Sequence, residues 1–216
     1  RDKCVVIPYA MHPDQHKPTP ADLDHIAELR ADPQPVVLFV GRLVAYKGVD
    51  VLLRAMVDVP ARLVIVGDGP LRSELETLAR SLAIDRRTRF VGNAASDELT
   101  ALYNACDVFV LPSVTRAEAF GMVQLEAMSC GKPVVSTNLP SGVPWVNRHG
   151  VTGLVVDPGD ARQLANALAT LVDDATLRDR LGAQGRARVE QEFSVRRLVE
   201  QTTGLYQNVV AASREW

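Results

Sequence analysis

The sequence has few cysteines and few aromatic residues. Its three cysteines are Cys4, Cys106 and Cys130, and aromatic residues make up 5% of the 216 positions. The cysteines are far apart, without a CxxC pair or a neighbouring histidine, so the spacing of a zinc site or a disulfide framework is missing. We therefore expect reduced thiols and a cytoplasmic protein.

A strong net charge and a long hydrophobic run are missing as well. The formal net charge of −2 gives no electrostatic basis for binding nucleic acid, and we expect none as a partner. No apolar run approaches the roughly 20 residues that a membrane-spanning helix needs. The sequence opens at Arg1 without a methionine, and we expect it to be a fragment.

What the sequence does contain is a regular alternation of two patterns. Short apolar runs predict strands at residues 4–7, 36–41, 62–67, 89–92, 108–111, 134–135 and 153–156. Amphipathic stretches predict helices at 21–30, 49–57, from 71, from 97, within 118–128, and at 161–172, 175–192 and 195–212. This order predicts an α/β fold with a doubly wound, Rossmann-like parallel sheet.

Ligands of such sheets bind beyond the carboxyl ends of the strands, so the loops that follow the strands are the candidate site. The loop Gly41–Gly48 holds two cations, Arg42 and Lys47. A planar guanidinium and a mobile ammonium both suit phosphate oxygens, although two solvated surface cations are the alternative. The GxxxxGK[ST] spacing of a Walker loop is absent.

Two carboxylates flank the start of the short helix within residues 118–128. Glu118 lies in the loop before it, and Glu126 lies inside an otherwise apolar stretch, where burial is costly unless a partner uses the charge. A helix start with Gly121 in its first turn also offers amide groups to an anion. Carboxylates suit the hydroxyls of a ligand, and the helix start suits its phosphates. A sugar nucleotide carries both groups and is therefore the favoured ligand.

Three further features have simpler explanations. The run Gly67–Pro70 lacks the third glycine of a dinucleotide fingerprint and predicts a turn and a helix cap, with Asp68 in the pocket as the alternative. The Asp22-Leu23-Asp24 pattern resembles a metal-binding DxD, but its place at a helix start favours capping, and we expect no required metal. Trp145 is either a core aromatic residue or a wall of the site.

In order and spacing, these motifs resemble glycosyltransferase family 4, the retaining enzymes of the GT-B fold. The resemblance covers about residues 1–208 and only the C-terminal, donor-binding half of such an enzyme. It rests on Gly41-Arg42 with Lys47-Gly48, Gly67–Leu71, Phe90–Gly92, Asp107–Ser113 and the E-x7-E pair Glu118 and Glu126. Residues 118–126 and 142–147 are similar to bacterial mannosyl- and rhamnosyltransferases of surface polysaccharide synthesis. After Pro8 the chain departs from the family, because the usual glycine and acid are absent.

The resemblance implies the donor-binding domain of a retaining hexosyltransferase that uses a nucleoside-diphosphate sugar, preferably GDP-mannose, without metal or cofactor. Arg42 and Lys47 would hold the diphosphate and Glu118 the transferred sugar, as the catalytic residues, while Glu126 would bind the ribose. The implied donor site comprises Gly41, Arg42, Lys47, Val91, Gly92, Glu118, Phe120, Gly121, Met122, Val123 and Glu126. The amides of residues 121–123 would face the phosphates, and the backbone at Val91 and Gly92 the base.

The resemblance also implies the domain organisation. We expect residues 1–20 to form an interdomain linker with a first strand, 21–192 the nucleotide-sugar-binding domain, and 193–216 a helix that crosses toward a missing N-terminal domain. That domain would bind a glycan or lipid-linked acceptor, so the fragment alone is expected to be inactive. The full enzyme could associate peripherally with the inner face of the membrane. The alternatives are a GT-B phosphorylase, a sugar-nucleotide epimerase or a non-catalytic sugar-nucleotide-binding module.

Overall fold

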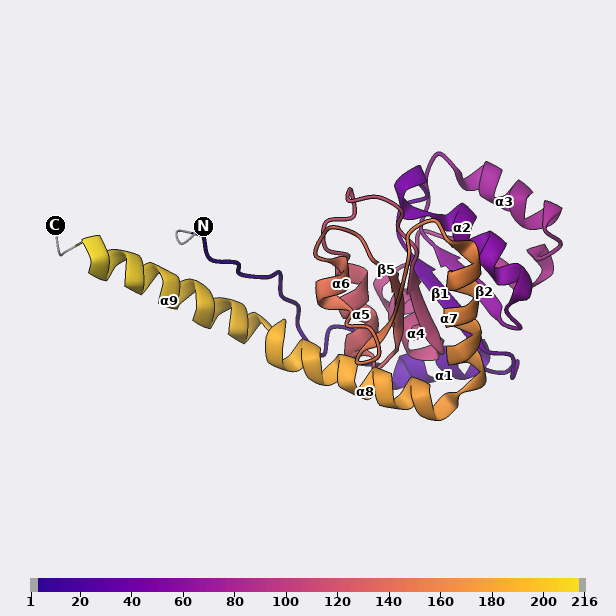
Figure 1. Cartoon of the computed structure of the whole chain (residues 1–216). Helices are drawn as coiled ribbons and strands as arrows, with labels where there is room; N and C mark the ends of the chain where they lie inside the picture. The colour runs from indigo at the N-terminus through magenta and orange to yellow at the C-terminus, as the bar shows by residue number, and fades with distance from the viewer. Residues whose placement is uncertain (1–3, 214–216) are drawn as a thin grey trace.

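The computed structural model describes residues 4–213 and contains one six-stranded sheet in the order β3-β2-β1-β4-β5-β6 (Figure 1). Every neighbouring pair of strands is parallel. The strands are β1 (Val36–Val40), β2 (Arg62–Val66), β3 (Thr88–Gly92), β4 (Val108–Leu111), β5 (Val134–Thr137) and β6 (Gly153–Val156). The predicted doubly wound parallel sheet is confirmed.

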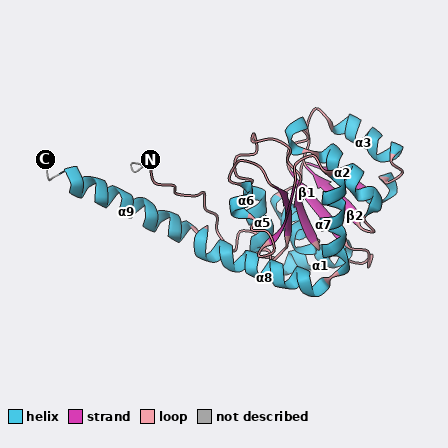
Figure 2. Cartoon of the chain, in the orientation of Figure 1, coloured by secondary structure: helices cyan, strands magenta, loops and turns pink. Residues whose placement is uncertain are grey.

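Helices cover both faces of this sheet (Figure 2). They are α1 (Pro20–Leu29), α2 (Val49–Ala55), α3 (Arg72–Ser81), α4 (Ser96–Ala105), α5 (Met122–Ser129), α6 (Val143–Val146), α7 (Ala161–Asp173), α8 (Ala175–Glu192) and α9 (Val195–Ser213). Parallel strands need such crossover helices, which explains why the two patterns alternate along the chain.

The continuous apolar strands result from burial on both faces. In β1, Val37 and Phe39 join the core cluster that α2 and α7 complete, whereas Leu38 and Val40 join the cluster that α4 and α5 complete. Successive strand residues point to opposite faces, so each face must be apolar in its own right. Because all the strands are parallel, the loops that follow them gather at one edge of the sheet.

The strand order reverses between β1 and β4. From β1 the chain adds β2 and β3 on one side, and then returns to place β4, β5 and β6 on the other side. A crevice at such a switch point, outside the carboxyl ends of the strands, is the usual ligand site of this architecture. The loops that follow β1 and β4 therefore border the candidate site.

The strand predicted at residues 4–7 is wrong. Residues 4–10 form no strand, and the side chains of Val5 and Val6 are 63% and 81% exposed. Apolar residues supply strand propensity only, and this run pairs with none of the described strands. The chain joins the domain at Met11, whose backbone N–H donates to the carbonyl of Phe193 at 2.9 Å, and His16 is then buried.

The predicted C-terminal helix is present as α9, which continues from α8 and projects away from the sheet (Figure 1). Its apolar side chains Val195, Val199 and Tyr206 are exposed. The prediction that it crosses toward another domain stays a prediction. Among residues 4–213, none of the helices combines the length and hydrophobicity that crossing a lipid bilayer requires.

Candidate functional site

The loops after β1 and β4 are in direct backbone contact at the switch point. The N–H of Val114 donates to the carbonyl of Tyr46 at 2.8 Å. Gly48 has a left-handed backbone with φ of 66°, and a Cβ atom there would lie 2.2 Å from the carbonyl oxygen of Pro112. Only glycine permits both the conformation and this close approach. The contact brings the preceding residue, Lys47, to the loop that carries Glu118.

Lys47 and Glu118 form a buried ion pair across these loops. Lys47 Nζ donates to Glu118 Oε2 at 2.5 Å, and Ser113 Oγ donates to the same oxygen at 2.9 Å. Their side chains are only 11% and 9% exposed. A buried charge of either sign is tolerable because its partner is present. Sequence reasoning placed both residues at one site but missed their pairing, since spacing along the chain carries no information about contacts between loops.

Arg42 is the second cation of the β1 loop and differs from Lys47 in its surroundings. It is exposed, and its side chain makes no hydrogen bond or ion pair with the residues that the structure describes. Gly41, before it, closes β1 by donating its N–H to the carbonyl of Val66 at 2.9 Å. The guanidinium of Arg42 therefore keeps all of its donors available to an anionic ligand.

Helix α5 presents an uncapped N-terminus beside the ion pair. Its N-cap residue is Gly121, with φ of 73°, and no side chain caps the helix. A Cβ at Gly121 would lie 2.6 Å from Leu111 Cδ2, so the tight turn after β4 also depends on glycine. The first-turn amides of Met122 and Val123 are thus open to an anion, and the helix dipole favours negative charge there.

Phe120 belongs to an aromatic cluster rather than to the ion pair. Its ring lies 5.5 Å from Tyr9, 6.2 Å from Trp145 and 6.0 Å from Phe193, measured between ring centroids. The indole of Trp145 is 41% exposed and packs against Phe193 and the guanidinium of Arg188. Trp145 is therefore partly exposed but packed within this cluster. Phe120 fixes the loop before α5 to the same cluster.

Val91 and Gly92 end β3 at the same edge of the sheet, separated from β1 by β2. The carbonyl of Gly92 accepts the N–H of Gly67 at 2.7 Å, and the contact of the Val91 and Gly92 backbone with the base stays a prediction. Asp68 accepts the N–H of Gly69 at 2.7 Å and faces Arg72 Nη1 at 3.4 Å. These contacts match the turn expected there, but the predicted cap does not form, because α3 begins after Leu71 without a side-chain cap and Pro70 lies before it.

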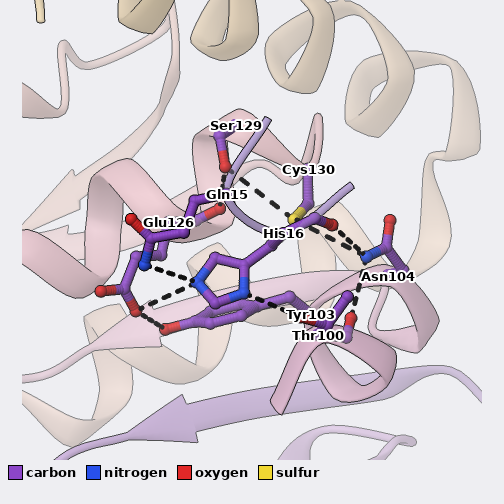
Figure 3. A network of polar contacts seen from close by, with 8 residues as sticks. All are labelled: Gln15, His16, Thr100, Tyr103, Asn104, Glu126, Ser129 and Cys130. Atoms are coloured by element: carbon purple, nitrogen blue, oxygen red, sulfur yellow. Dashed lines mark hydrogen bonds and ion pairs between the residues drawn. The ribbon is translucent and has the colours of Figure 1, made fainter. Parts of the chain in front are cut away.

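Glu126 lies one helical turn beyond Met122, as expected, but it has a protein partner that the sequence did not reveal. The hydroxyl of Tyr103 donates to Glu126 Oε2 at 2.6 Å, and His16 Nε2 lies 4.0 Å from the same oxygen (Figure 3). Tyr103 is fully buried, and a buried phenol requires a partner for its hydroxyl. In the sequence, the only signal of this contact was that a buried tyrosine needs a hydrogen-bond partner. That signal does not identify Glu126 as the partner.

The prediction that Asp22 caps a helix is confirmed. Its Oδ2 accepts both the backbone N–H and the hydroxyl of Thr19, each at 2.7 Å. The backbone hydrogen bond, followed by the hydroxyl, lowers the pKa of Asp22, because both stabilise the carboxylate. No group of three His, Cys, Asp or Glu side chains suited to a metal ion occurs in the described part of the chain.

Comparison with known families assigns this architecture and these loops to a class. Residues 22–188 match the sequence profile of the family described as "Glycosyl transferases group 1". The chain belongs to that family.

Its relatives include proteins named as rhamnosyl- and mannosyltransferases. The D-rhamnosyltransferase WbpZ of Pseudomonas aeruginosa is 35% identical over 195 residues, which cover 90% of this chain and 50% of that protein. A GDP-mannose-dependent alpha-(1-6)-phosphatidylinositol monomannoside mannosyltransferase of Mycobacterium tuberculosis is 35% identical over 198 residues, covering 87% and 51%. The chain thus spans about half the length of these relatives.

Solved structures show the same fold. Anabaena HepE in complex with UDP and glucose superposes with a TM-score of 0.84 at 27% identity, covering 94% of this chain and 57% of HepE. A sucrose-phosphate synthase from Thermosynechococcus elongatus gives 0.84 at 34% identity, covering 96% and 53%. The C-terminal domain of a group 1 glycosyl transferase from Francisella tularensis, at 24% identity and a TM-score of 0.74, is matched over 99% of its length. The predicted fold, the C-terminal half of a GT-B enzyme, is confirmed.

Proposed function

We propose that the chain is the donor-binding domain of a retaining hexosyltransferase that uses a nucleoside-diphosphate sugar. The observation that carries this proposal is the buried Lys47–Glu118 pair, which lies at the switch point next to the uncapped start of α5. Cations and open amides suit a diphosphate, and a carboxylate suits sugar hydroxyls.

The phosphate side of the site would stabilise the leaving group. Negative charge builds on the diphosphate as the glycosidic bond breaks, and Arg42, Lys47 and the first-turn amides of α5 supply positive charge and donors there. Arg42 is exposed and ready to bind, whereas Lys47 must exchange part of its contact with Glu118 for a phosphate oxygen. Ligand binding would therefore rearrange a pair that already exists.

The sugar side of the site would position the transferred hexose. Glu118 is held as an acceptor by Lys47 and Ser113, which lowers its reactivity as a nucleophile. This arrangement favours a front-face reaction, in which the leaving phosphate helps to deprotonate the acceptor and the configuration is retained. Glu118 then orients the sugar, and proximity with charge stabilisation supplies the rate. A bound metal ion has no assigned step.

We propose GDP-mannose as the donor and a glycan or glycolipid as the acceptor. The support comes from the mycobacterial relative, whose name specifies GDP-mannose, and from the rhamnosyltransferase relative. The bound UDP of HepE, at 27% identity, makes the base the first point to test. The remaining half of the enzyme would hold the acceptor, in the cytoplasm or at the inner face of the membrane. The isolated chain would then bind nucleotide without appreciable turnover.

Calorimetric titration of the chain with GDP, UDP and ADP tests the proposal. Saturable binding of one nucleotide, with GDP preferred, is the expected result, and no heat with any of the three would overturn it. Fusion to the N-terminal half of a relative then tests catalysis. Transfer by the fusion is expected, whereas binding without transfer would favour a non-catalytic sugar-nucleotide-binding module.

Two variants test the phosphate contacts. A hydrogen bond to a charged group contributes roughly 1.5–3 kcal/mol, so Arg42→Ala and Lys47→Ala should each weaken nucleotide binding by about tenfold to a hundredfold. Arg42→Ala is the cleaner variant because it leaves no buried partner behind, unlike Lys47→Ala. Arg54→Ala removes an exposed cation from α2 and serves as the control, with unchanged affinity expected. Equal affinities for Arg42→Ala and the control would remove Arg42 from the site.

A further inference from the structure

The carboxylate of Glu126 is held from the side of α4. Tyr103 Oη donates to Glu126 Oε2 at 2.6 Å, within a network that joins α4, α5 and the segment before α1 (Figure 3). The tyrosine side chain is fully buried, and the glutamate side chain is 20% exposed. One end of this contact is therefore fixed by the core, and the other end reaches the surface.

Tyr103 is a permanent donor in this contact. Burial raises the pKa of Tyr103 well above its usual range, and the negative charge of Glu126 adds to the effect. The phenol keeps its proton and directs it at Oε2, in a hydrogen bond strengthened by the charge of the acceptor. No described residue forms a hydrogen bond with the other oxygen, Oε1. One oxygen is committed, and one is available.

His16 closes the space on the other side of the carboxylate. Its ring is 4% exposed, lies 4.9 Å from the ring of Tyr103 and has Nε2 4.0 Å from Glu126 Oε2. Its Nδ1 contacts Thr100 Oγ1 at 3.1 Å, and its carbonyl accepts from Asn104 Nδ2 at 2.9 Å. The ring is thus fixed on α4, and two rings leave the glutamate little choice of rotamer.

We propose that Tyr103 is a positioning residue for the ribose of the donor: it orients Glu126 so that the free Oε1 accepts hydrogen bonds from the ribose hydroxyls. This inference rests on the proposed function, because it requires a nucleotide beside α5. A glutamate that is already ordered loses less conformational freedom when the ligand binds. A carboxylate can only accept, so the groups that it recognises must be hydroxyl donors.

A comparison of two ligands tests the positioning role. The nucleoside diphosphate that the chain binds among GDP, UDP and ADP is titrated beside its 2′,3′-dideoxy counterpart, into wild type and into Tyr103→Phe. Wild type should bind the dideoxy ligand about tenfold more weakly, as expected for a lost charge-assisted hydrogen bond. Tyr103→Phe should bind the natural ligand about tenfold more weakly than wild type does. For this variant, the ratio of the dissociation constants of the dideoxy and natural ligands should fall to about twofold.

The ratio separates positioning from a general structural effect. A variant that merely loosened α5 would weaken both ligands equally and keep the tenfold ratio, which would overturn the inference. Tyr206→Phe removes an exposed hydroxyl from α9 and should keep both the affinity and the ratio. Glu126→Gln should lose the ratio as Tyr103→Phe does.

The outcomes also separate this inference from the function on which it rests. No binding of any nucleotide by wild type would overturn both. Binding with no preference between the two ligands would overturn the inference and leave the donor site in place. Should Tyr103→Phe not fold, a structure of the wild-type complex decides the question. Glu126 Oε1 within hydrogen-bonding distance of the ribose, with the Tyr103 contact intact, is expected, and a broken contact would overturn the inference.

Discussion

Lys47 and Glu118 show what a residue type can and cannot reveal. The sequence placed a cation after one strand and a carboxylate after another, and both lie at the switch point. It could not show that they neutralise one another, because the contact depends on how closely two loops approach. The contacts of Tyr103 and His16 with Glu126 could not be predicted for the same reason. Tyr103 is 23 positions and His16 is 110 positions away from Glu126 in the sequence.

His16 gives a prediction at the residue scale. Burial lowers the pKa of His16 from its ordinary value of 6.5, and the nearby charge of Glu126 opposes this effect. Tyr103 and the Cys130 thiol also face the residue. The unfolded chain then binds a proton more readily than the folded chain, so the free energy of unfolding falls as the pH drops from about 6.5 through the lowered pKa.

Urea denaturation over a pH series measures this contribution. Wild type should lose stability relative to His16→Gln as the pH falls below 6.5, by at most about 1.4 kcal/mol per pH unit for one proton. His12→Gln, at an exposed position, is the control and should follow wild type. Parallel curves for wild type and His16→Gln would show that His16 does not titrate differently on folding.

At the scale of elements, the strands were the most predictable part of the molecule. Runs such as Val36–Val40 are apolar throughout because both faces of the sheet are covered. The same signal failed at residues 4–7, where the apolar run pairs with no described strand. Propensity is local, whereas pairing is decided by the rest of the fold.

The contact between the β1 and β4 loops gives a prediction at this scale. Gly48→Ala adds a Cβ only 2.2 Å from the Pro112 carbonyl, at a left-handed φ, so both steric overlap and backbone strain apply. Each typically costs about 1–3 kcal/mol, and the substitution should lower the free energy of unfolding by about 2–6 kcal/mol. It should also part Lys47 from Glu118 and weaken nucleotide binding.

Gly131→Ala is the matched control for this substitution. Gly131 has a similar φ of 69°, but a Cβ there would meet no atom within 4 Å. It therefore reports the backbone term alone, at roughly 1–2 kcal/mol. Chemical denaturation of both variants compares them. Equal destabilisation would mean that the loops can separate freely, and that their contact does not hold the ion pair.

At the scale of the whole molecule, α9 adds little to the folded core. The residues of α9 whose burial is described are exposed or half-buried, whereas α8 buries Leu181 and Val189, and Phe193 follows it in the core. Removal of residues 195–216 should change the melting temperature by no more than about 4 °C, the shift expected for 1 kcal/mol in a domain of this size. Nucleotide binding should be preserved.

Circular dichroism during heating checks this expectation. A truncation after Asp174, which also removes α8, serves as the positive control and should abolish cooperative unfolding, because buried side chains of both core clusters are lost. Loss of the transition on removal of α9 alone would show that the helix is part of the domain's core.

The hydrogen bond between Met11 and Phe193 also has a mechanical consequence. The segment that enters the domain and the helices that leave it are joined at Met11 and Phe193 and by the ion pair of Asp14 with Arg186, and both run out on the same side (Figure 1). A second body carried on these two segments could not slide freely across the donor site. Its movement relative to the donor site would be limited by how far the two segments bend beyond these contacts.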